Sequence, residues 1–309
     1  MIPQRILVPT DLSENAARAY PYARALAERF GSRLDVVHII PSTDELSLLL
    51  ARSGAPFEQT KELYTMLQAE RQAQLEAIAQ EAFGDLLGEI RISLGRPFEA
   101  LLESINSGRY ELVVLSTRGA GNVPVGAGAT AERILRRAQV PVFAVPADAP
   151  ETPRWERILY PTDFSEVSRA ALPWALLLAE AFGSTLVVFH MLYLGEDPQV
   201  IEKAPSEAEL EAMRQRLHAH LGTVHPLESE DSIRRTAESA PVRLERVLVR
   251  GYAAYDEILQ YAEEQADAIV MATHGRTGLA HLLLGSTAEK VLHHSRKPVL
   301  VIRPERFRS

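Results

Sequence analysis

The chain has 309 residues, of which 46% are hydrophobic and 24% are charged, and this length predicts about two domains. Its net charge of −8 makes it a poor general binder of DNA or anionic lipid, so we expect neither nucleic acid nor membrane as a partner. The lack of cysteine excludes disulfides, thiol catalysis and thiolate metal sites. No uncharged apolar stretch approaches the roughly 18 residues of a membrane span, and the first residues are typical of a strand rather than a signal peptide. We therefore expect a cytoplasmic protein.

Short apolar runs alternate with longer helical segments along the first half of the chain. The runs are rich in Val, Ile and Leu without strict polar alternation, which is typical of strands covered on both faces. We expect strands at 5–8, 33–40, 89–94, 112–116 and 142–146. We expect helices at 14–30, 57–83, 97–107 and 130–137. Gly31 stands where the end of a helix favours a left-handed residue.

The sequence contains an internal repeat. Residues 5–14 read RILVPTDLSE and residues 157–166 read RILYPTDFSE, and the same offset of 152 carries His38 onto His190. Two copies of about 150 residues agree with the usual size of a domain. We expect one domain over 1–147 and a second over 154–309, with the boundary in the polar, proline-bearing stretch between them.

The second half repeats the strand and helix pattern of the first. We expect its strands at 157–160, 185–192, 242–249, 268–272 and 299–303. Alternating strands and helices predict an α/β fold, with a doubly wound, five-stranded parallel sheet in each half. Such Rossmann-like sheets bind ligands beyond the carboxyl ends of their strands, so the loops after the first and fourth strands are the candidate sites.

The loop after the fourth strand of the second half has features of a phosphate site. Gly275 allows a close backbone approach or a positive φ. Gly285 and Ser286 open a helix, where free N–H groups and the positive dipole end attract anions. Ser286 with Glu289 is equally a capping box, which needs no ligand. We expect Gly285→Val to block a phosphate and to disfavour a positive φ at this position.

At these residues the chain resembles the universal stress protein family, and in particular its members with two such domains. The resemblance rests on the paired Pro-Thr-Asp segments, the long second helix and the loop above, and it covers 5–303. The family's ATP motif is Gly, two residues, Gly, nine residues, Gly, then Ser or Thr. Here Ala272, Gly275, Gly285 and Ser286 match that spacing, with alanine in place of the first glycine. The resemblance implies a fold like that of adenine nucleotide alpha hydrolases.

The resemblance further implies that ATP, with or without magnesium, binds at the strand ends of the second half. It implies that Asp163 faces the adenosine, that Met191 packs on the adenine and that the loop glycines hold the phosphates. The implied cofactor-binding residues are Pro161, Thr162, Asp163, Met191, Met271, Ala272, His274, Gly275, Gly285, Ser286 and Thr287. Structural alternatives stand beside these roles: Asp163 or Ser165 as a helix cap, Met191 as core and His274 as a loop hydrogen-bonding residue.

The first half keeps the same frame with a degenerate motif. Its weaker second site would comprise Asp11, Ile39, Gly119, Gly128 and Thr130. Eight residues rather than nine separate Gly119 from Gly128, and Ala129 replaces the serine hydroxyl. We therefore expect this half to bind nucleotide weakly or not at all, and one nucleotide per chain.

We expect the nucleotide to act as a regulatory ligand in a stress response. No catalytic residue and no metal ligand is assigned, since the sequence has neither a Gly-Lys-Ser/Thr loop nor a Gly-x-Ser-x-Gly elbow. The alternatives are a slow ATPase or other adenine-nucleotide enzyme, and a ligand-free scaffold. We also expect the last strands of the two halves to pair antiparallel, making an intrachain pseudo-dimer, while a homodimer of chains stays open.

Overall fold

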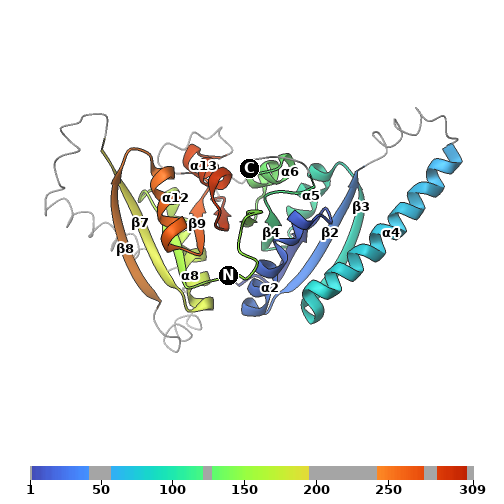
Figure 1. The fold of residues 1–309 in the computed structure, drawn as a ribbon, viewed down its shortest axis with the longest axis horizontal. Coiled ribbons are helices and arrows are strands. Elements are labelled where there is room, and N and C mark those ends of the chain that lie inside the picture. Colours follow the sequence, from blue (N-terminus) through green and yellow to red (C-terminus); the bar gives the residue numbers. More distant parts are fainter. Residues whose placement is uncertain (1, 42–56, 121–126, 195–241, 275–283, 305–309) are drawn as a thin grey trace. The chain divides into compact units, whose positions relative to one another are not determined.

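The computed structural model describes residues 2–41, 57–120, 127–194, 242–274 and 284–304. The chain divides into two compact units, Met1–Pro153 and Arg154–Ser309. Each unit has the predicted α/β architecture, with helices packed on a parallel sheet (Figure 1). Within the described residues, no helix combines the length and the apolar character that crossing a membrane requires.

The first unit is built on five parallel strands. They are β1 (Arg5–Pro9), β2 (Arg33–Pro41), β3 (Leu87–Gly95), β4 (Leu112–Ser116) and β5 (Val142–Val145). Its helices are α1 (Glu14–Ala17), α2 (Tyr20–Phe30), α4 (Phe57–Phe83), α5 (Pro97–Ile105) and α6 (Ala129–Arg137), with a 3-10 turn η1 (Gly84–Leu86). β1 pairs with β2 and with β4, β2 also pairs with β3, and β4 with β5. The strand order is therefore β3-β2-β1-β4-β5. The chain adds β2 and β3 on one side of β1 and then β4 and β5 on the other side, so the topological switch point lies between β1 and β4.

The second unit repeats this topology. Its strands are β6 (Arg157–Pro161), β7 (Thr185–Tyr193), β8 (Arg243–Gly251), β9 (Ala268–Ala272) and β10 (Val299–Ile302). Its helices are α7 (Glu166–Arg169), α8 (Leu172–Phe182), α12 (Ala254–Gln265) and α13 (Ser286–His294). β6 pairs in parallel with β7 and β9, β7 with β8, and β9 with β10. The switch point lies between β6 and β9.

The handedness of the connections accounts for helices on both faces of each sheet. A crossover between parallel strands is right-handed in nearly every protein. In the first unit α2 and α4 connect strands that progress from β1 toward β3, whereas α5 and α6 connect strands that progress the opposite way. The two pairs therefore lie on opposite faces, and each pair packs together. Burial on both faces explains why Ile6, Leu7 and Val8 of β1 have no exposed surface.

The expected single helix over 14–30 is wrong. The structure has a short helix α1 that ends at Ala17 and a separate helix α2 that begins at Tyr20. Pro21 is the second residue of α2, where its missing N–H is tolerated, but further inside a continuous helix it would remove a hydrogen bond. The second unit breaks at the same place, with Pro173 near the start of α8.

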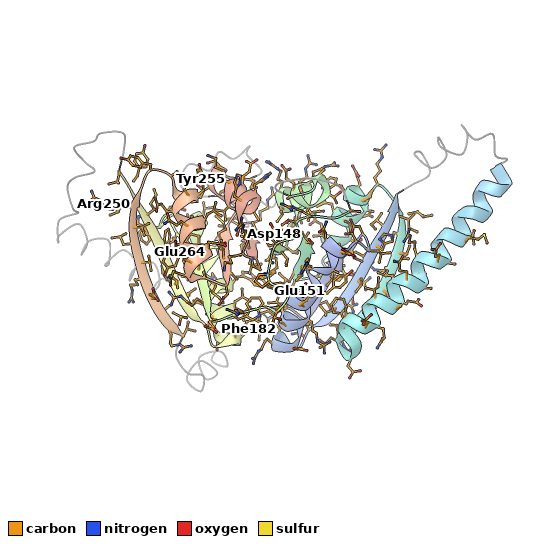
Figure 2. All side chains as sticks on the ribbon, viewed as in Figure 1. Asp148, Glu151, Phe182, Arg250, Tyr255 and Glu264 are labelled. Carbon is orange, nitrogen blue, oxygen red and sulfur yellow. The ribbon has the colours of Figure 1, made fainter. Side chains whose placement is uncertain are left out.

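The segment that precedes the unit boundary is fixed to the first unit. Arg18 Nη1 lies 2.6 Å from a carboxylate oxygen of Glu151, which is labelled in Figure 2. The hydroxyl of Tyr22 donates a hydrogen bond of 2.9 Å to the carbonyl of Pro150. These contacts hold the proline-bearing stretch against α1 and α2.

Candidate functional site

The second unit has a cavity of about 270 Å³ at the carboxyl ends of β6, β7 and β9. Ten of the eleven residues singled out in the sequence line it: Pro161, Thr162, Asp163, Met191, Met271, Ala272, His274, Gly285, Ser286 and Thr287. Gly275 lies outside the described residues. The cavity therefore lies at the switch point, beside the loops after the first and fourth strands, where doubly wound sheets bind ligands.

The turn after β6 is held by its own side chains. Thr162 N–H donates to the carbonyl of Phe189 at 2.9 Å, which ties the end of β6 to β7. Asp163 Oδ1 accepts the N–H of Ser165 at 3.0 Å. Ser165 is the N-cap of α7, and its hydroxyl accepts the N–H of Ser168. Ser165, rather than Asp163, therefore caps the helix, while Asp163 braces the turn and also lines the cavity.

The residue after Asp163 adopts an unusual backbone conformation. Phe164 has a φ of 62°, and its counterpart Leu12 in the first unit has a φ of 66°. Bulky residues rarely take this left-handed conformation, which places strain at the turn in both units. The ring of Phe164 lies 4.3 Å from the ring of His190, and this contact holds it in place.

The histidine that the repeat aligned also lines the cavity, although its role was not predicted. His190 is buried, and its Nδ1 lies 2.7 Å from the carbonyl oxygen of Thr162. Because a carbonyl only accepts, Nδ1 carries the proton, and Nε2 of the neutral ring is a hydrogen-bond acceptor. His38 makes the same bond to Thr10 in the first unit, at 2.9 Å. The identical spacing of both histidines from the Pro-Thr-Asp segments was the available signal.

Thr273 and Gly285, at the two ends of the loop between β9 and α13, lie close together, and we call this junction the neck of the loop. Thr273 N–H donates to the carbonyl of Ile302 at 2.9 Å, and Gly285 N–H donates to the carbonyl of Thr273 at 2.7 Å. A Cβ at Gly285 would lie 3.0 Å from that carbonyl oxygen. The φ of Gly285 is −73°, so the expected need for a positive φ is wrong. Glycine is required here by the close approach of the two backbone segments.

The capping-box interpretation of Ser286 and Glu289 is also wrong. Gly285 is the N-cap of α13 and has no side chain to cap it, and Ser286 is already the first helical residue. The first turn of α13 therefore presents backbone N–H groups and the side chains of Ser286 and Thr287 to the cavity. Its position is fixed against α12, because Lys290 Nζ lies 4.1 Å from the ring of Tyr255, which is labelled in Figure 2.

The charges around the cavity are sparse. Of the described residues that line it, only Asp163, His190 and His274 are ionisable, and none is lysine or arginine. His274 is 4% exposed, and its Nδ1 lies 2.9 Å from the hydroxyl of Thr273. Among the described lining residues, an anion in this cavity would meet N–H and O–H dipoles.

The first unit has a cavity of about 530 Å³ at the corresponding position. All five residues expected there line it: Asp11, Ile39, Gly119, Gly128 and Thr130. Gly128 N–H donates to the carbonyl of Thr117 at 2.7 Å, which repeats the neck of the second unit. A Cβ at Gly128 would lie 3.7 Å from that carbonyl oxygen, which is an ordinary contact. The neck of the first unit is therefore less crowded.

Comparison with known proteins shows the same twofold organisation. A model of the universal stress protein family matches residues 3–146 and again 154–303. A universal stress protein of Synechocystis is 26% identical over 322 residues, which cover 97% of this chain and 100% of that protein. One from Mycobacterium tuberculosis is 30% identical over 234 residues, covering 73% of each chain.

A solved structure agrees at the level of the fold. The crystal structure of a universal stress protein from Archaeoglobus fulgidus matches 97% of this chain and 98% of its own, with a TM-score of 0.61 and 21% identity. The family model covers both halves of the chain, each half folds into the same doubly wound sheet, and curated relatives match along nearly the full length. The chain therefore belongs to the universal stress protein family and carries the family's domain twice.

Proposed function

We propose that the second unit binds an adenine nucleotide, with ATP as the principal ligand, and that the nucleotide acts as a regulatory ligand in a cytoplasmic stress response. The observation that carries this proposal is the gathering of ten predicted residues around one cavity at the switch point. These residues come from four separate elements, and they meet where doubly wound sheets hold their ligands.

The cavity offers two kinds of surface, which suit the two ends of a nucleotide. Met191, Met271 and Ile258 provide an apolar side for a base. The first turn of α13, with Ser286 and Thr287, provides donors for phosphate oxygens. A ligand that is flat and apolar at one end and anionic at the other satisfies both.

Magnesium should tighten the binding of ATP. The described lining residues include the Asp163 carboxylate but no lysine or arginine. ATP carries more negative charge than AMP, and a bound divalent cation neutralises part of that charge. We therefore expect a stronger effect of magnesium on ATP than on AMP.

The test is calorimetric titration of the full chain with ATP, ADP and AMP, each with and without magnesium. Ser286→Glu places a carboxylate in the first turn of α13, where an acidic residue favours the helix but repels a phosphate. Ala129→Glu makes the same change at the first helical residue of α6 and is the matched control. We expect Ser286→Glu to weaken ATP binding at least about tenfold and Ala129→Glu to leave it unchanged. Equal ATP affinity in both variants would refute the site.

The catalytic alternative is a slow ATPase. Phosphoryl transfer needs a positioned nucleophile and fixed metal ligands. The described lining residues that could accept a proton are Asp163, whose Oδ1 accepts the Ser165 N–H, and the histidines His190 and His274. A multiple-turnover assay of phosphate release decides the matter. Release that continues well beyond one phosphate per chain, and is lost in Ser286→Glu, would favour the enzyme.

The second alternative is a scaffold without a ligand. Mass spectrometry of the purified and then denatured protein addresses it, because a tightly bound ligand copurifies with its protein. An adenine nucleotide released in near-stoichiometric amount supports the proposal. Protein that carries no nucleotide and binds none in the titration would favour the scaffold.

We also propose that the last strands of the two units pair antiparallel, so that the chain is its own dimer. Such pairing would cover two sheet edges that otherwise invite aggregation. The lack of native cysteine allows clean spin-labelling at introduced pairs. Antiparallel pairing predicts that a label at Ala147 lies nearer to one at Lys297 than to one at Pro304. The opposite order of distances would exclude this arrangement.

A further inference from the structure

The threonine of each Pro-Thr-Asp segment supports the left-handed residue that follows it in the turn. In the first unit the N–H of Leu12 donates to Thr10 Oγ1 at 3.0 Å. In the second unit the N–H of Phe164 donates to Thr162 Oγ1 at 3.1 Å. Both threonines are buried. A buried hydroxyl is stabilised by further hydrogen bonds, and the two units supply different partners for it.

In the first unit the partner is a tyrosine of α2. Thr10 Oγ1 lies 2.6 Å from the hydroxyl of Tyr20, which is the first residue of that helix. The ring of Tyr20 is buried and packs edge-on against the ring of Phe83 in α4, with 5.4 Å between the ring centroids. The turn after β1 is therefore held from α2.

In the second unit the partner comes from the short helix α7. Thr162 Oγ1 lies 3.0 Å from Oγ of Ser168, a buried residue that lines the cavity. The hydroxyl of Ser168 also donates to the carbonyl of Ser165 at 3.0 Å. The hydroxyl of Tyr160 on β6 donates to the carbonyl of Ser168 at 3.1 Å. Ser168 therefore joins the end of the strand, the turn and the helix.

The repeat shows that these are two solutions to the same problem, built from three positions. The offset of 152 aligns Val8 with Tyr160, Ala16 with Ser168 and Tyr20 with Leu172. The tyrosine thus stands on the helix in the first unit and on the strand in the second. The N-cap bond of the short helix is 3.1 Å in both units, so the backbone there is unchanged. What the second unit adds at this position is the hydroxyl of Ser168.

The turn that this hydroxyl supports carries the carboxylate of the cavity. Asp163 lies between Thr162 and Phe164, and it lines the cavity. The φ of 62° at Phe164 is unfavourable by itself and depends on its surroundings. When support at Thr162 is lost, other conformations of the turn become populated, and in these the carboxylate has a different position. The apparent affinity for a ligand then falls with the fraction of chains in which the turn is intact.

We propose that Ser168 is a positioning residue of the nucleotide site: its hydroxyl holds Thr162, Thr162 holds the left-handed turn, and the turn sets the place of Asp163. Tyr20 holds the corresponding turn of the first unit. The inference rests on the proposed function for its ligand. It adds that a change in α7 acts on the ATP site, whereas the equivalent change in α2 does not.

The first test is calorimetric titration of the full chain with ATP. Ser168→Ala removes the hydroxyl and should weaken ATP binding about three- to tenfold. Tyr20→Phe is the matched control, because it removes the hydroxyl that holds the turn of the first unit, and it should leave ATP binding unchanged. Wild-type affinity in Ser168→Ala would overturn the inference.

A rescue variant separates positioning from direct contact between Ser168 and the ligand. Tyr160→Val and Leu172→Tyr, added to Ser168→Ala, rebuild the arrangement of the first unit in the second, at nearly conserved volume. The serine hydroxyl is still absent, but a tyrosine hydroxyl from α8 can again bond Thr162. ATP affinity should therefore return to within about twofold of the wild type. A folded triple variant that still binds ATP weakly would show that the inference is wrong.

Hydrogen exchange, measured by mass spectrometry without nucleotide, reports on the turns themselves and decides the matter where the triple variant does not fold. Ser168→Ala should speed exchange at least about threefold in residues 162–168 and leave residues 10–16 unchanged. Tyr20→Phe should give the reverse pattern. Faster exchange spread evenly over the second unit would indicate a merely structural role for Ser168 and would contradict the proposal.

This inference and the proposed function can fail separately. If the wild-type chain binds no ATP, the proposed function is refuted, and the exchange pattern still decides whether Ser168 holds the turn. If ATP binding is lost in Ser286→Glu but is unaffected by Ser168→Ala, the positioning role is refuted and the proposed function stands.

Discussion

The N–H of Gly285 donates a 2.7 Å hydrogen bond to the carbonyl of Thr273, and this bond joins the end of β9 to the start of α13. A side chain at Gly285 has little room, since its Cβ would lie 3.0 Å from the same oxygen and 3.4 Å from the Cα of His274. The neck therefore sets the distance between the last strand residues and the first helical N–H groups of the cavity.

Gly285→Val should abolish nucleotide binding by the second unit and leave the fold largely intact. The φ of −73° and ψ of 148° are accessible to valine, so the effect comes from crowding at the neck and in the cavity. Titration with ATP measures the loss, and circular dichroism checks the fold. Gly128→Val is the matched control, because its Cβ contact is an ordinary 3.7 Å. Wild-type affinity for ATP in Gly285→Val would show that the phosphate loop is misassigned.

Alanine at the two necks should have unequal effects on stability. Gly285 and Gly128 are both helix N-caps, so the general preference for glycine over alanine at that position cancels in the comparison. The remaining difference is the 3.0 Å contact against the 3.7 Å contact. We expect Gly285→Ala to lose about 1 kcal/mol more of the free energy of unfolding than Gly128→Ala. Chemical denaturation measures both, and equal losses would contradict a crowded neck at Gly285.

ATP should titrate to one equivalent per chain. The second unit has a serine as the first residue of α13, whereas the first unit has Ala129 there. A lost hydrogen bond to a charged group costs about 1.5–3 kcal/mol, or about ten- to a hundred-fold in affinity. Gly285→Val should remove nearly all of the measured heat. Two equally tight ATP sites would instead show that the loop with Ala129 is a competent phosphate cradle.

Stability should fall at alkaline pH through a buried tyrosine of β6. Burial raises the pKa of Tyr160 above its ordinary value of 10.0. Above about pH 10 the unfolded chain therefore loses a proton that the folded chain keeps, so the free energy of unfolding declines as pH rises. Below about pH 10 this contribution is fully present.

The matched variant for this effect is Tyr160→Phe. The variant lacks the hydrogen bond from the Tyr160 hydroxyl to the Ser168 carbonyl. Below about pH 10 this loss changes the free energy of unfolding by the same amount at every pH. The alkaline slope of the wild type should exceed that of the variant by up to about 1.4 kcal/mol per pH unit. Denaturation curves recorded across the alkaline range measure both slopes. Parallel pH profiles for the two proteins would mean that Tyr160 ionises as readily in the folded chain as in the unfolded chain.

The sequence predicted the strands well because both faces of each sheet are covered. In an alternating α/β chain, a short continuous apolar run such as the one in β1 indicates a strand buried on both faces. The break between α1 and α2 was missed, because Pro21 inside an amphipathic stretch does not reveal which turn of a helix it begins. Helix caps, and the side chains that would contact a nucleotide base, depend on where each element begins and ends. These boundaries are the feature that a sequence reveals least.

The candidate site was only partly visible in the sequence. Motif spacing indicated Gly285, yet it could not distinguish a glycine needed for a positive φ from one needed for a close approach. The bond between Asp11 and Ala120 joins residues that are 109 positions apart, and no local pattern announces it. The two histidines were aligned by the repeat, but their place in the cavities depends on strand register, which required the structure.

The left-handed backbone conformation of Leu12 and Phe164 affects ligand binding at the turns after β1 and β6. A bulky residue in this conformation costs roughly 1–3 kcal/mol, and it persists only where its surroundings leave no alternative. The carboxylates of the preceding residues, Asp11 and Asp163, therefore have a fixed position before a ligand binds. Because the chain has lost the conformational freedom of this turn during folding, an incoming ligand need not freeze it again, and the entropy cost of association falls accordingly.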